Sequence, residues 1–262
     1  MSVLRELADL VLPGGCAGCG AERVPLRHGA CATCVAEVEQ LRPGVATPEP
    51  PPPGMPRCVA AGTYGGAVRG MLLAYKEHGR HALARPLGAV LAAAVAEVAP
   101  ARPGPLLVVP VPSTVAAQRE RLGDHMARLA THAVRRLRRS GWDAAMAQPL
   151  RAAPRPDSAS LGVSARRVAA ENSLRIRKTR IAVPTRRTTM RSTLVVVDDI
   201  VTTGATLAVV TARLEEANMQ VTGAAVIAAT RLRRTPPPRT AGRPPRGGAG
   251  TSRHAGGSPN EG

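Results

Sequence analysis

The chain has 262 residues, of which 44% are hydrophobic, and its 36 Lys+Arg against 18 Asp+Glu give a net charge of +18. With one tryptophan, two tyrosines and no phenylalanine, the core must be built from Ala, Val and Leu, and binding of single-stranded nucleic acid by base stacking is close to excluded. The charge alone identifies no acidic partner, because it is nearly all arginine, as a GC-rich coding sequence would produce.

Shifts in composition divide the chain into four parts. Residues 1–42 hold four of the five cysteines. Residues 43–56 contain four consecutive prolines and are expected to form an extended linker. Residues 57–234 are expected to fold as an α/β domain. Residues 235–262, rich in Pro, Gly, Arg and Ser, are expected to form a disordered basic tail.

The first twelve residues predict no targeting signal. Arg5, Glu6 and Asp9 break the order of a signal peptide, in which basic residues precede an apolar run. Uncharged runs such as Pro86–Ala96 are too short to span a membrane. We therefore expect a soluble cytoplasmic protein without membrane insertion.

Two Cys-x-x-Cys pairs, Cys16 with Cys19 and Cys31 with Cys34, lie close together in the sequence. Four thiolates complete a tetrahedral zinc shell and leave no open position for chemistry, and a cytoplasmic setting disfavours two disulfides. The tetrad therefore predicts a structural zinc knuckle, and whether the knuckle also binds a partner stays open. Cys58 lies outside the pattern and is expected to be a buried thiol.

The α/β part alternates between predicted strands and predicted helices. The expected strands are Val59–Tyr64, Leu106–Val111, Leu194–Asp198 and Val221–Ala229. The expected helices are Gly65–Lys76, Ala82–Ala99, Val115–Ser140 and Ala205–Ala217. Continuous apolar strands separated by helices predict a mainly parallel sheet that is covered on both faces.

The most informative stretch follows the third predicted strand. That strand ends in two carboxylates, Asp198 and Asp199, and leads through a hydroxyl-rich turn into a helix; the turn consists of Thr202, Thr203, Gly204, Ala205 and Thr206. A helix start offers free amide groups to a phosphate monoester, and glycine allows close approach. The carboxylates are placed to accept from vicinal sugar hydroxyls or to reach a metal-bound sugar phosphate. An ordinary threonine cap would leave the paired carboxylates unexplained.

This stretch resembles the phosphoribosyl-pyrophosphate (PRPP) motif of type I phosphoribosyltransferases. With the four-cysteine knuckle, the chain resembles the ComF family of competence-associated, phosphoribosyltransferase-like proteins over roughly residues 3–230. Gly62–Arg69 followed by Lys76, Val108–Ser113, and Asp157–Asn172 also look like segments of that family. The resemblance implies a type I phosphoribosyltransferase-like fold, with a parallel sheet flanked by helices.

By this resemblance, the Thr202–Thr206 turn would hold the ribose 5-phosphate of PRPP, and Asp198 and Asp199 would contact the ribose 2- and 3-hydroxyls. The pyrophosphate would be approached by Val111, Pro112 and Ser113. Magnesium would arrive bound to PRPP. The implied reaction is displacement of pyrophosphate by a nitrogen acceptor, which depends on positioning and charge stabilisation. The acceptor and any catalytic residue stay unassigned.

One segment departs from the family pattern of Arg-Gly-His-Asp-His or Arg-Gly-Phe-Asn-Gln. Here the chain reads Arg121-Leu-Gly-Asp-His125, so Leu122 and Gly123 differ. His125 is as consistent with packing on a helix face as with a ligand role. Lys76 is expected to be a solvated charge at a helix end.

Seven positive residues and no acid fall in Arg175–Arg191. Such a segment can track a phosphate backbone, although a solvated loop is the favoured interpretation. The alternative to an enzyme is a non-catalytic PRPP- or nucleotide-binding component of a DNA-uptake (competence) or DNA-handling assembly, with DNA or a competence protein as its partner. Pyrophosphate release in the presence of an acceptor distinguishes the enzyme from this alternative.

Overall fold

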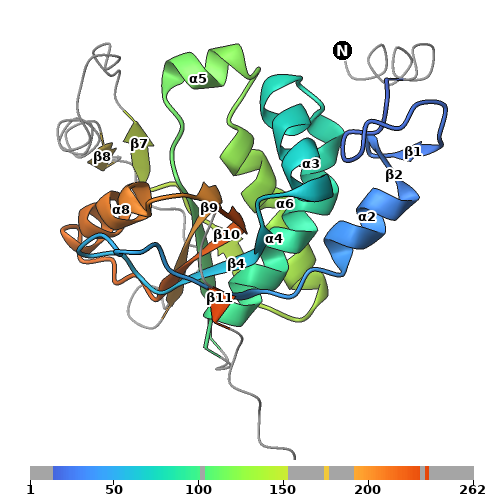
Figure 1. Ribbon diagram of the computed structural model, residues 1–262. Coiled ribbons are helices and arrows are strands. Elements are labelled where there is room, and N and C mark those ends of the chain that lie inside the picture. The colour runs from blue at the N-terminus through green and yellow to red at the C-terminus, as the bar shows by residue number, and fades with distance from the viewer. Residues whose placement is uncertain (1–13, 101–103, 153–173, 177–191, 231–233, 236–262) are drawn as a thin grey trace, which may run out of the picture.

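The computed structural model describes residues 14–100, 104–152, 174–176, 192–230 and 234–235. A seven-stranded sheet in the order β11-β3-β4-β10-β9-β5-β6 forms its centre (Figure 1). The strands from β4 to β6 in that order are parallel, while β3 and β11 are antiparallel at one edge. The predicted mainly parallel sheet is thus confirmed.

The parallel strands are β4 (Cys58–Thr63), β5 (Leu106–Pro110), β6 (Ala144–Met146), β9 (Thr193–Val201) and β10 (Gly223–Ala229). All but β6 correspond to predicted strands. In β9, Val195 and Val197 face one apolar core, while Leu194 and Val196 face the other. Because both faces of the sheet are covered, these strands are apolar without alternation.

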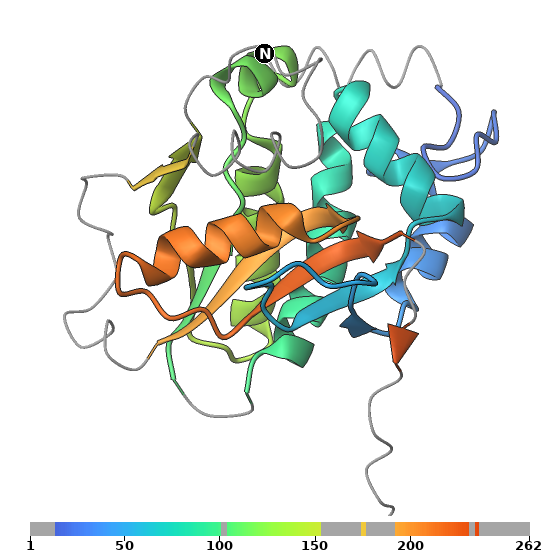
Figure 2. The ribbon, with the colours of Figure 1, turned by 60° about the vertical axis from the view of Figure 1, so that its left-hand side comes forward.

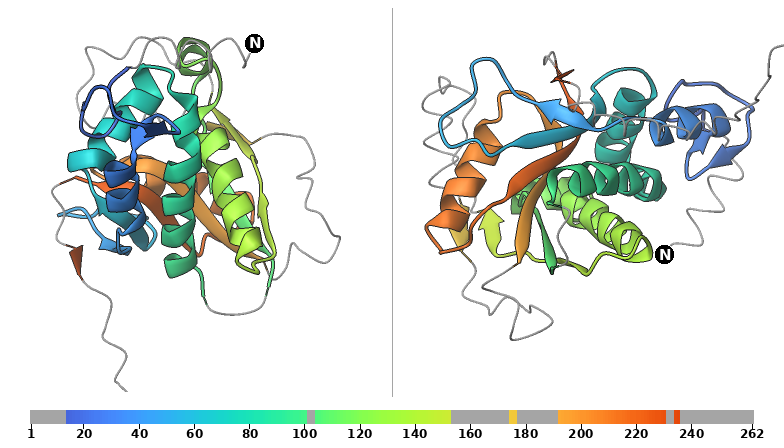
Figure 3. Two further views of the ribbon diagram at one scale, coloured as in Figure 1. Left: turned by 90° about the vertical axis from the view of Figure 1, so that its right-hand side faces the viewer. Right: turned by 90° about the horizontal axis from the view of Figure 1, so that it is seen from below.

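Helices cover both faces of the sheet (Figures 2 and 3). One face carries α8 (Ala205–Glu215). The other carries α4 (Ala84–Val98) and α6 (His125–Arg139). Before α4 come α3 (Gly66–Glu77) and a single 3-10 turn, η1 (His81–Leu83). The resulting three layers match the predicted fold class.

The prediction of one helix over Val115–Ser140 is wrong. The structure has α5 (Val115–Glu120) and α6, separated by a tight turn. Leu122 and Gly123 have φ values of 53° and 130°, a left-handed conformation that ends a helix. The Asp124 carboxylate then accepts from Ala127 N at 3.0 Å and caps α6. The break turns Leu122 toward solvent and starts the second helix at His125.

The packing of α4 against α6 depends on Gly88. A Cβ at this position would lie 2.5 Å from His132 Cβ and 3.1 Å from Leu129 O. We expect Gly88→Ala to lower the free energy of unfolding by about 1–3 kcal/mol through overpacking, although alanine favours helix by about 1 kcal/mol. Urea denaturation measures this difference. The control Ala93→Ser, at an exposed position of α4, should cost less than about 0.7 kcal/mol, and an equal loss in both variants would contradict the close-packing argument.

The cysteine-containing module packs on the main core. It consists of the hairpin β1 (Leu26–Arg27) and β2 (Ala30–Cys31), followed by α2 (Ala32–Glu39). Cys34 and Val38 are buried in one cluster with residues of α3 and α4. The knuckle therefore shares its hydrophobic core with the sheet and helices.

The segment predicted as a linker contributes a strand to the central sheet. Within it, β3 (Gly44–Ala46) pairs with β4, and β11 (Arg234–Thr235) pairs with β3. Thr235, expected to begin the tail, thus lies in a strand, while residues 236–262 lie outside the described chain. A separate two-stranded sheet joins β7 (Leu150–Ala152) to β8 (Leu174–Ile176). The rest of Arg175–Arg191 and all of Asp157–Asn172 also fall outside the described residues.

Among the residues described, one helical stretch, His81–Val98, is long and apolar enough to cross a membrane. It comprises η1 and α4, and 61% of it is buried inside the protein. Because α4 packs on β4, β10 and α6, its apolar composition is explained by its place in the core.

Candidate functional site

Asp198 and Asp199 lie near the carboxyl end of the central strand β9, at the point where β5 no longer pairs with it. β5 pairs with β9 only as far as Val197, whereas β10 accompanies β9 to Val201. The predicted strand Leu194–Asp198 is therefore too short, because β9 continues past Asp198 to Val201. Beyond Pro110 the β5 side of β9 is free of a paired strand, and this carboxyl end of a parallel sheet is where such folds bind ligands.

A cavity of about 320 Å³ lies at this edge. Six residues singled out in the sequence line it: Val111, Pro112, Ser113, Asp198, Asp199 and Thr206. Lys76, Arg121 and His125 also line it. Thr202, Thr203, Gly204 and Ala205 form the turn between Val201 and the start of α8 but do not line the cavity. The fold thus brings together three segments that are far apart in the sequence.

Asp199 is the centre of a polar network. Lys76 Nζ lies 2.7 Å from Asp199 Oδ2, and His125 Nε2 lies 3.1 Å from the same oxygen. On its other side, His125 Nδ1 lies 3.2 Å from Ser113 Oγ. Although burial opposes it, the His125 hydrogen bond and the Lys76 charge hold the pKa of Asp199 below its usual range. The expectation that Lys76 is a solvated helix-end charge is therefore wrong.

Asp198 is shifted in the opposite direction. Burial and the adjacent Asp199 carboxylate raise the pKa of Asp198 to about 8, although Asp198 Oδ1 accepts from Asp199 N at 2.9 Å. Near neutral pH the pair thus holds one proton and about one negative charge. A bound cation would favour ionisation of Asp198.

The turn after β9 has the backbone conformation of a tight, amide-rich loop. Gly204 has a φ of 74° and precedes the first residue of α8. A side chain at Gly204 would overlap Met55 Sδ and lie 3.2 Å from Pro48 Cγ. Thr203 Oγ1 accepts from Ala205 N at 3.4 Å. The Pro-rich segment therefore packs on this turn, a contact that the sequence did not predict.

Removing the Lys76 charge should expose the energetic role of this network. We expect Lys76→Met to lower the free energy of unfolding at pH 7 by about 1.5–3 kcal/mol, because a buried carboxylate loses a charged hydrogen-bond partner. A carboxyl with a depressed pKa stabilises the fold above its unfolded pKa, near 4, and loses that contribution as the pH falls. The difference between variant and wild type should therefore shrink from pH 7 to pH 3 in thermal unfolding. Lys76→Arg serves as the charge-retaining control, and a loss independent of pH would contradict the pairing.

The cysteine tetrad has the geometry of a closed metal site. All four Sγ atoms lie within 4.8 Å of one another, and Cys19 Sγ is 4.0 Å from Cys31 Sγ. A tetrahedral zinc shell with Zn–S bonds of about 2.3 Å has sulfur–sulfur edges of about 3.8 Å. The residues therefore fit zinc, and with four protein ligands the ion would be structural.

Backbone donors support a thiolate at the tetrad. Gly18 N and Cys31 N lie 3.4 Å and 3.1 Å from Cys16 Sγ. Despite burial, these bonds and a further one from Cys19 lower the pKa of Cys16 to about 6. Cys58 is buried in β4, as predicted, and burial raises its pKa to about 12. Burial also raises the pKa of Cys34, so the metal assignment rests on the arrangement of the four sulfurs and not on their pKa values.

The comparison with known families agrees with this site. A family model described as the phosphoribosyl transferase domain matches residues 161–241. The match contains Asp198, Asp199 and the threonine turn, whereas Lys76, Val111–Ser113 and the cysteines precede it. No curated protein sequence matches the chain. The parallel sheet and the site agree with this match to a phosphoribosyl transferase domain over part of the chain.

Proposed function

We propose that the protein is a cytoplasmic PRPP-binding phosphoribosyltransferase of the ComF family. It would transfer a phosphoribosyl group from Mg-PRPP to a nitrogen acceptor and release pyrophosphate. The observation that carries this proposal is the single cavity lined by the β9 carboxylates, the loop after β5 and the first turn of α8. The phosphoribosyl transferase match over residues 161–241 supports the donor, and the knuckle resemblance supports the ComF assignment.

Each part of PRPP has a complementary group in or beside this cavity. The amides at the start of α8 and the threonine hydroxyls would bind the 5-phosphate. Asp198 and Asp199 would accept from the vicinal ribose hydroxyls, and the pyrophosphate would lie near Ser113. Magnesium would neutralise charge on the pyrophosphate, and the two aspartates are the carboxylates in the cavity that can reach it.

The proposed reaction needs positioning and negative charge more than a strong base. The bond from the ribose anomeric carbon to pyrophosphate breaks with its electron pair leaving on pyrophosphate. The acceptor nitrogen forms the new bond to that carbon and loses a proton. Positive charge develops on the ribose, and Asp199, kept ionised by Lys76 and His125, supplies a preorganised negative charge.

A second candidate is the non-catalytic component of a DNA-handling assembly. The observation that favours it is the departure at Leu122 and Gly123. There a left-handed turn separates α5 from α6 and leaves Leu122 59% exposed. The His or Phe side chain that the family pattern has at the position of Gly123 is absent, although Arg121 and His125 still line the cavity. Such a protein would bind PRPP or a nucleotide without turnover.

Titration of Mg-PRPP into the full-length protein, followed by a screen for pyrophosphate release, separates the two candidates. Nucleobases, glutamine and ammonia are the acceptors to test. Saturable binding with release for at least one acceptor is expected of the enzyme. PRPP binding with no release for any acceptor would favour the second candidate. Absence of PRPP binding would overturn the enzyme, and absence of nucleotide binding as well would overturn the second candidate.

A further inference from the structure

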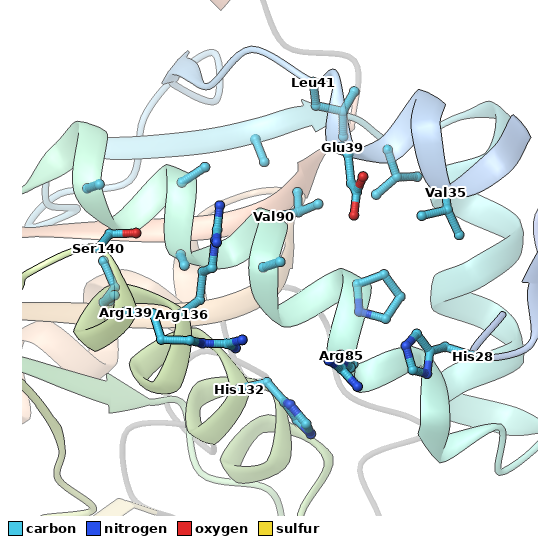
Figure 4. Close-up of a pocket in the computed structure, with 18 of the residues that line it drawn as sticks. His28, Val35, Glu39, Leu41, Arg85, Val90, His132, Arg136, Arg139 and Ser140 are labelled. Atoms are coloured by element: carbon cyan, nitrogen blue, oxygen red, sulfur yellow. The ribbon is translucent and has the colours of Figure 1, made fainter. Parts of the chain in front are cut away.

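A second cavity lies between α2, α4 and α6, and none of its lining residues is shared with the 320 Å³ cavity (Figure 4). Its volume is about 640 Å³, within the range of small-molecule sites, roughly 300–1,000 Å³. Apolar side chains form much of its wall, among them Val35 and Val38 of α2 and Val90 of α4. We call it the helix-side cavity.

Basic side chains from three elements converge on one end of the helix-side cavity. Arg85 comes from α4, His28 from the turn between β1 and β2, and His132 from α6 (Figure 4). Burial and the positive charge of Arg85 lower the pKa of both histidines, so these groups lie within electrostatic range of one another. Arg136 and Arg139 line the cavity farther along α6.

Positive side chains outnumber acidic ones in the walls of the helix-side cavity. Of the described residues that line it, four are arginines and one, Glu39, is acidic. Arginine and histidine side chains around a concave, partly apolar space are suited to a phosphate group, because the planar guanidinium donates two parallel hydrogen bonds to it. The apolar wall is available for the remainder of the same ligand.

We propose that the helix-side cavity binds a phosphorylated small molecule with an apolar or aromatic body, of the size of a nucleoside monophosphate. The phosphate would lie among Arg85, His28 and His132, and the body would pack against Val35 and Val90. A nucleic-acid strand fits less well. Trp142 is the only Phe, Tyr or Trp among the described lining residues. The cavity therefore lacks the series of large aromatic side chains on which successive bases stack.

The chain contains its own reporter for this site. Trp142 is the only tryptophan in the sequence. It lines the helix-side cavity and does not line the 320 Å³ cavity proposed to bind PRPP. A ligand in the helix-side cavity should therefore change the intrinsic fluorescence of the protein. AMP, GMP, CMP and UMP are the probes, and adenosine and inorganic phosphate serve as the two halves of AMP. Calorimetry gives the affinity independently of ligand absorbance.

At least one monophosphate should bind saturably below about 1 mM, and its nucleoside and phosphate halves each at least tenfold more weakly. Arg85→Gln and His132→Gln should each weaken binding of the monophosphate at least tenfold, because both side chains belong to the proposed phosphate site. Arg69→Gln is the matched control, since Arg69 is exposed on α3 and does not line the cavity. Thermal unfolding and zinc content verify that the variants are folded.

Binding at this site should survive Asp198→Asn, so its outcome is separate from that of the PRPP cavity. Equal affinity for AMP and adenosine would overturn the phosphate assignment. Unchanged binding in the Arg85→Gln and His132→Gln double variant would overturn the location. Failure of all four monophosphates, including the case in which only an oligonucleotide binds, would overturn the proposal.

Discussion

The double variant Asp198→Asn with Asp199→Asn is expected to bind Mg-PRPP at least 100-fold more weakly than the wild type. It removes both carboxylates that line the 320 Å³ cavity among the described residues. With magnesium bound, which favours ionisation of Asp198, each carboxylate is worth about 1.5–3 kcal/mol as a charged hydrogen-bond acceptor, so their joint loss corresponds to about two or more factors of ten. Isothermal titration calorimetry with Mg-PRPP measures the change. Zinc content should stay at the wild-type level, because the cysteines line neither this cavity nor its turn.

The single variant Asp198→Asn keeps the Lys76–Asp199 ion pair and serves as the folded reference. Asp143→Asn, at an exposed position outside the cavity, is the matched control and should bind PRPP as the wild type does. Zinc loss in the double variant would contradict the independence of the two sites. Full PRPP affinity in that variant would remove the assignment of the carboxylates to the ribose.

Asp198→Asn should also change how stability depends on pH. A carboxyl whose pKa is raised to about 8 binds its proton more tightly in the folded protein. Its stabilising contribution is therefore present below its unfolded pKa, near 4, and is lost as the pH rises toward 8. Relative to wild type, the variant should therefore gain up to about 1.4 kcal/mol of stability per pH unit from pH 5 to pH 8, and each kcal/mol corresponds to about 2–4 °C in Tm. A constant difference across this range would contradict the pKa shift.

Removing the zinc that we propose for the cysteine tetrad, by chelation or by Cys34→Ser, is expected to lower the Tm by more than about 10 °C. Structural zinc contributes about 10–16 kcal/mol in zinc-finger peptides, which is comparable with the whole stability of a domain, about 5–15 kcal/mol. Cys16, Cys34 and Val38 share one buried cluster with α3 and α4. Loss of the metal should therefore destabilise the helical layer of the domain as well as the knuckle.

Differential scanning calorimetry with metal analysis measures the effect of removing the zinc. Cys58→Ala is the matched control, because Cys58 is buried in β4 away from the tetrad. It should keep one zinc per chain and lose only the stability of a small core truncation, about 1 kcal/mol. An unchanged Tm in zinc-free protein would contradict the metal's structural role.

The parts of the fold that depend on local pattern were predictable. Leu106–Pro110 and the apolar part of β9 are continuous apolar runs, which are typical of a strand covered on both faces. Asp198 to Thr206 carry a recognisable motif. The single helix predicted over Val115–Ser140 failed because its apolar period continues through Leu122. The left-handed turn there leaves this pattern unchanged, and the Asp124 cap that restarts the helix was not recognised.

Lys76 shows why pattern alone misjudged part of the site. At the end of an amphipathic helix a lone lysine is usually solvated, and nothing in its neighbourhood in the sequence indicates otherwise. Its partner Asp199 lies 123 positions later in the chain, and the two meet only because α3 and β9 converge on one cavity. His125, for which packing and a ligand role were equally consistent, is drawn into the same network by Asp199 and Ser113.

By itself, then, the sequence determined the α/β class, the paired cysteines and the carboxylate–threonine stretch, because each depends on residues that are close together along the chain. The tertiary structure decided which distant residues join them. It placed Lys76 and His125 on Asp199, packed the Pro-rich segment against Gly204, and enclosed a second basic cavity between α2, α4 and α6. These contacts follow from how helices and strands pack, and packing joins residues whose separation in the sequence carries no periodic signal.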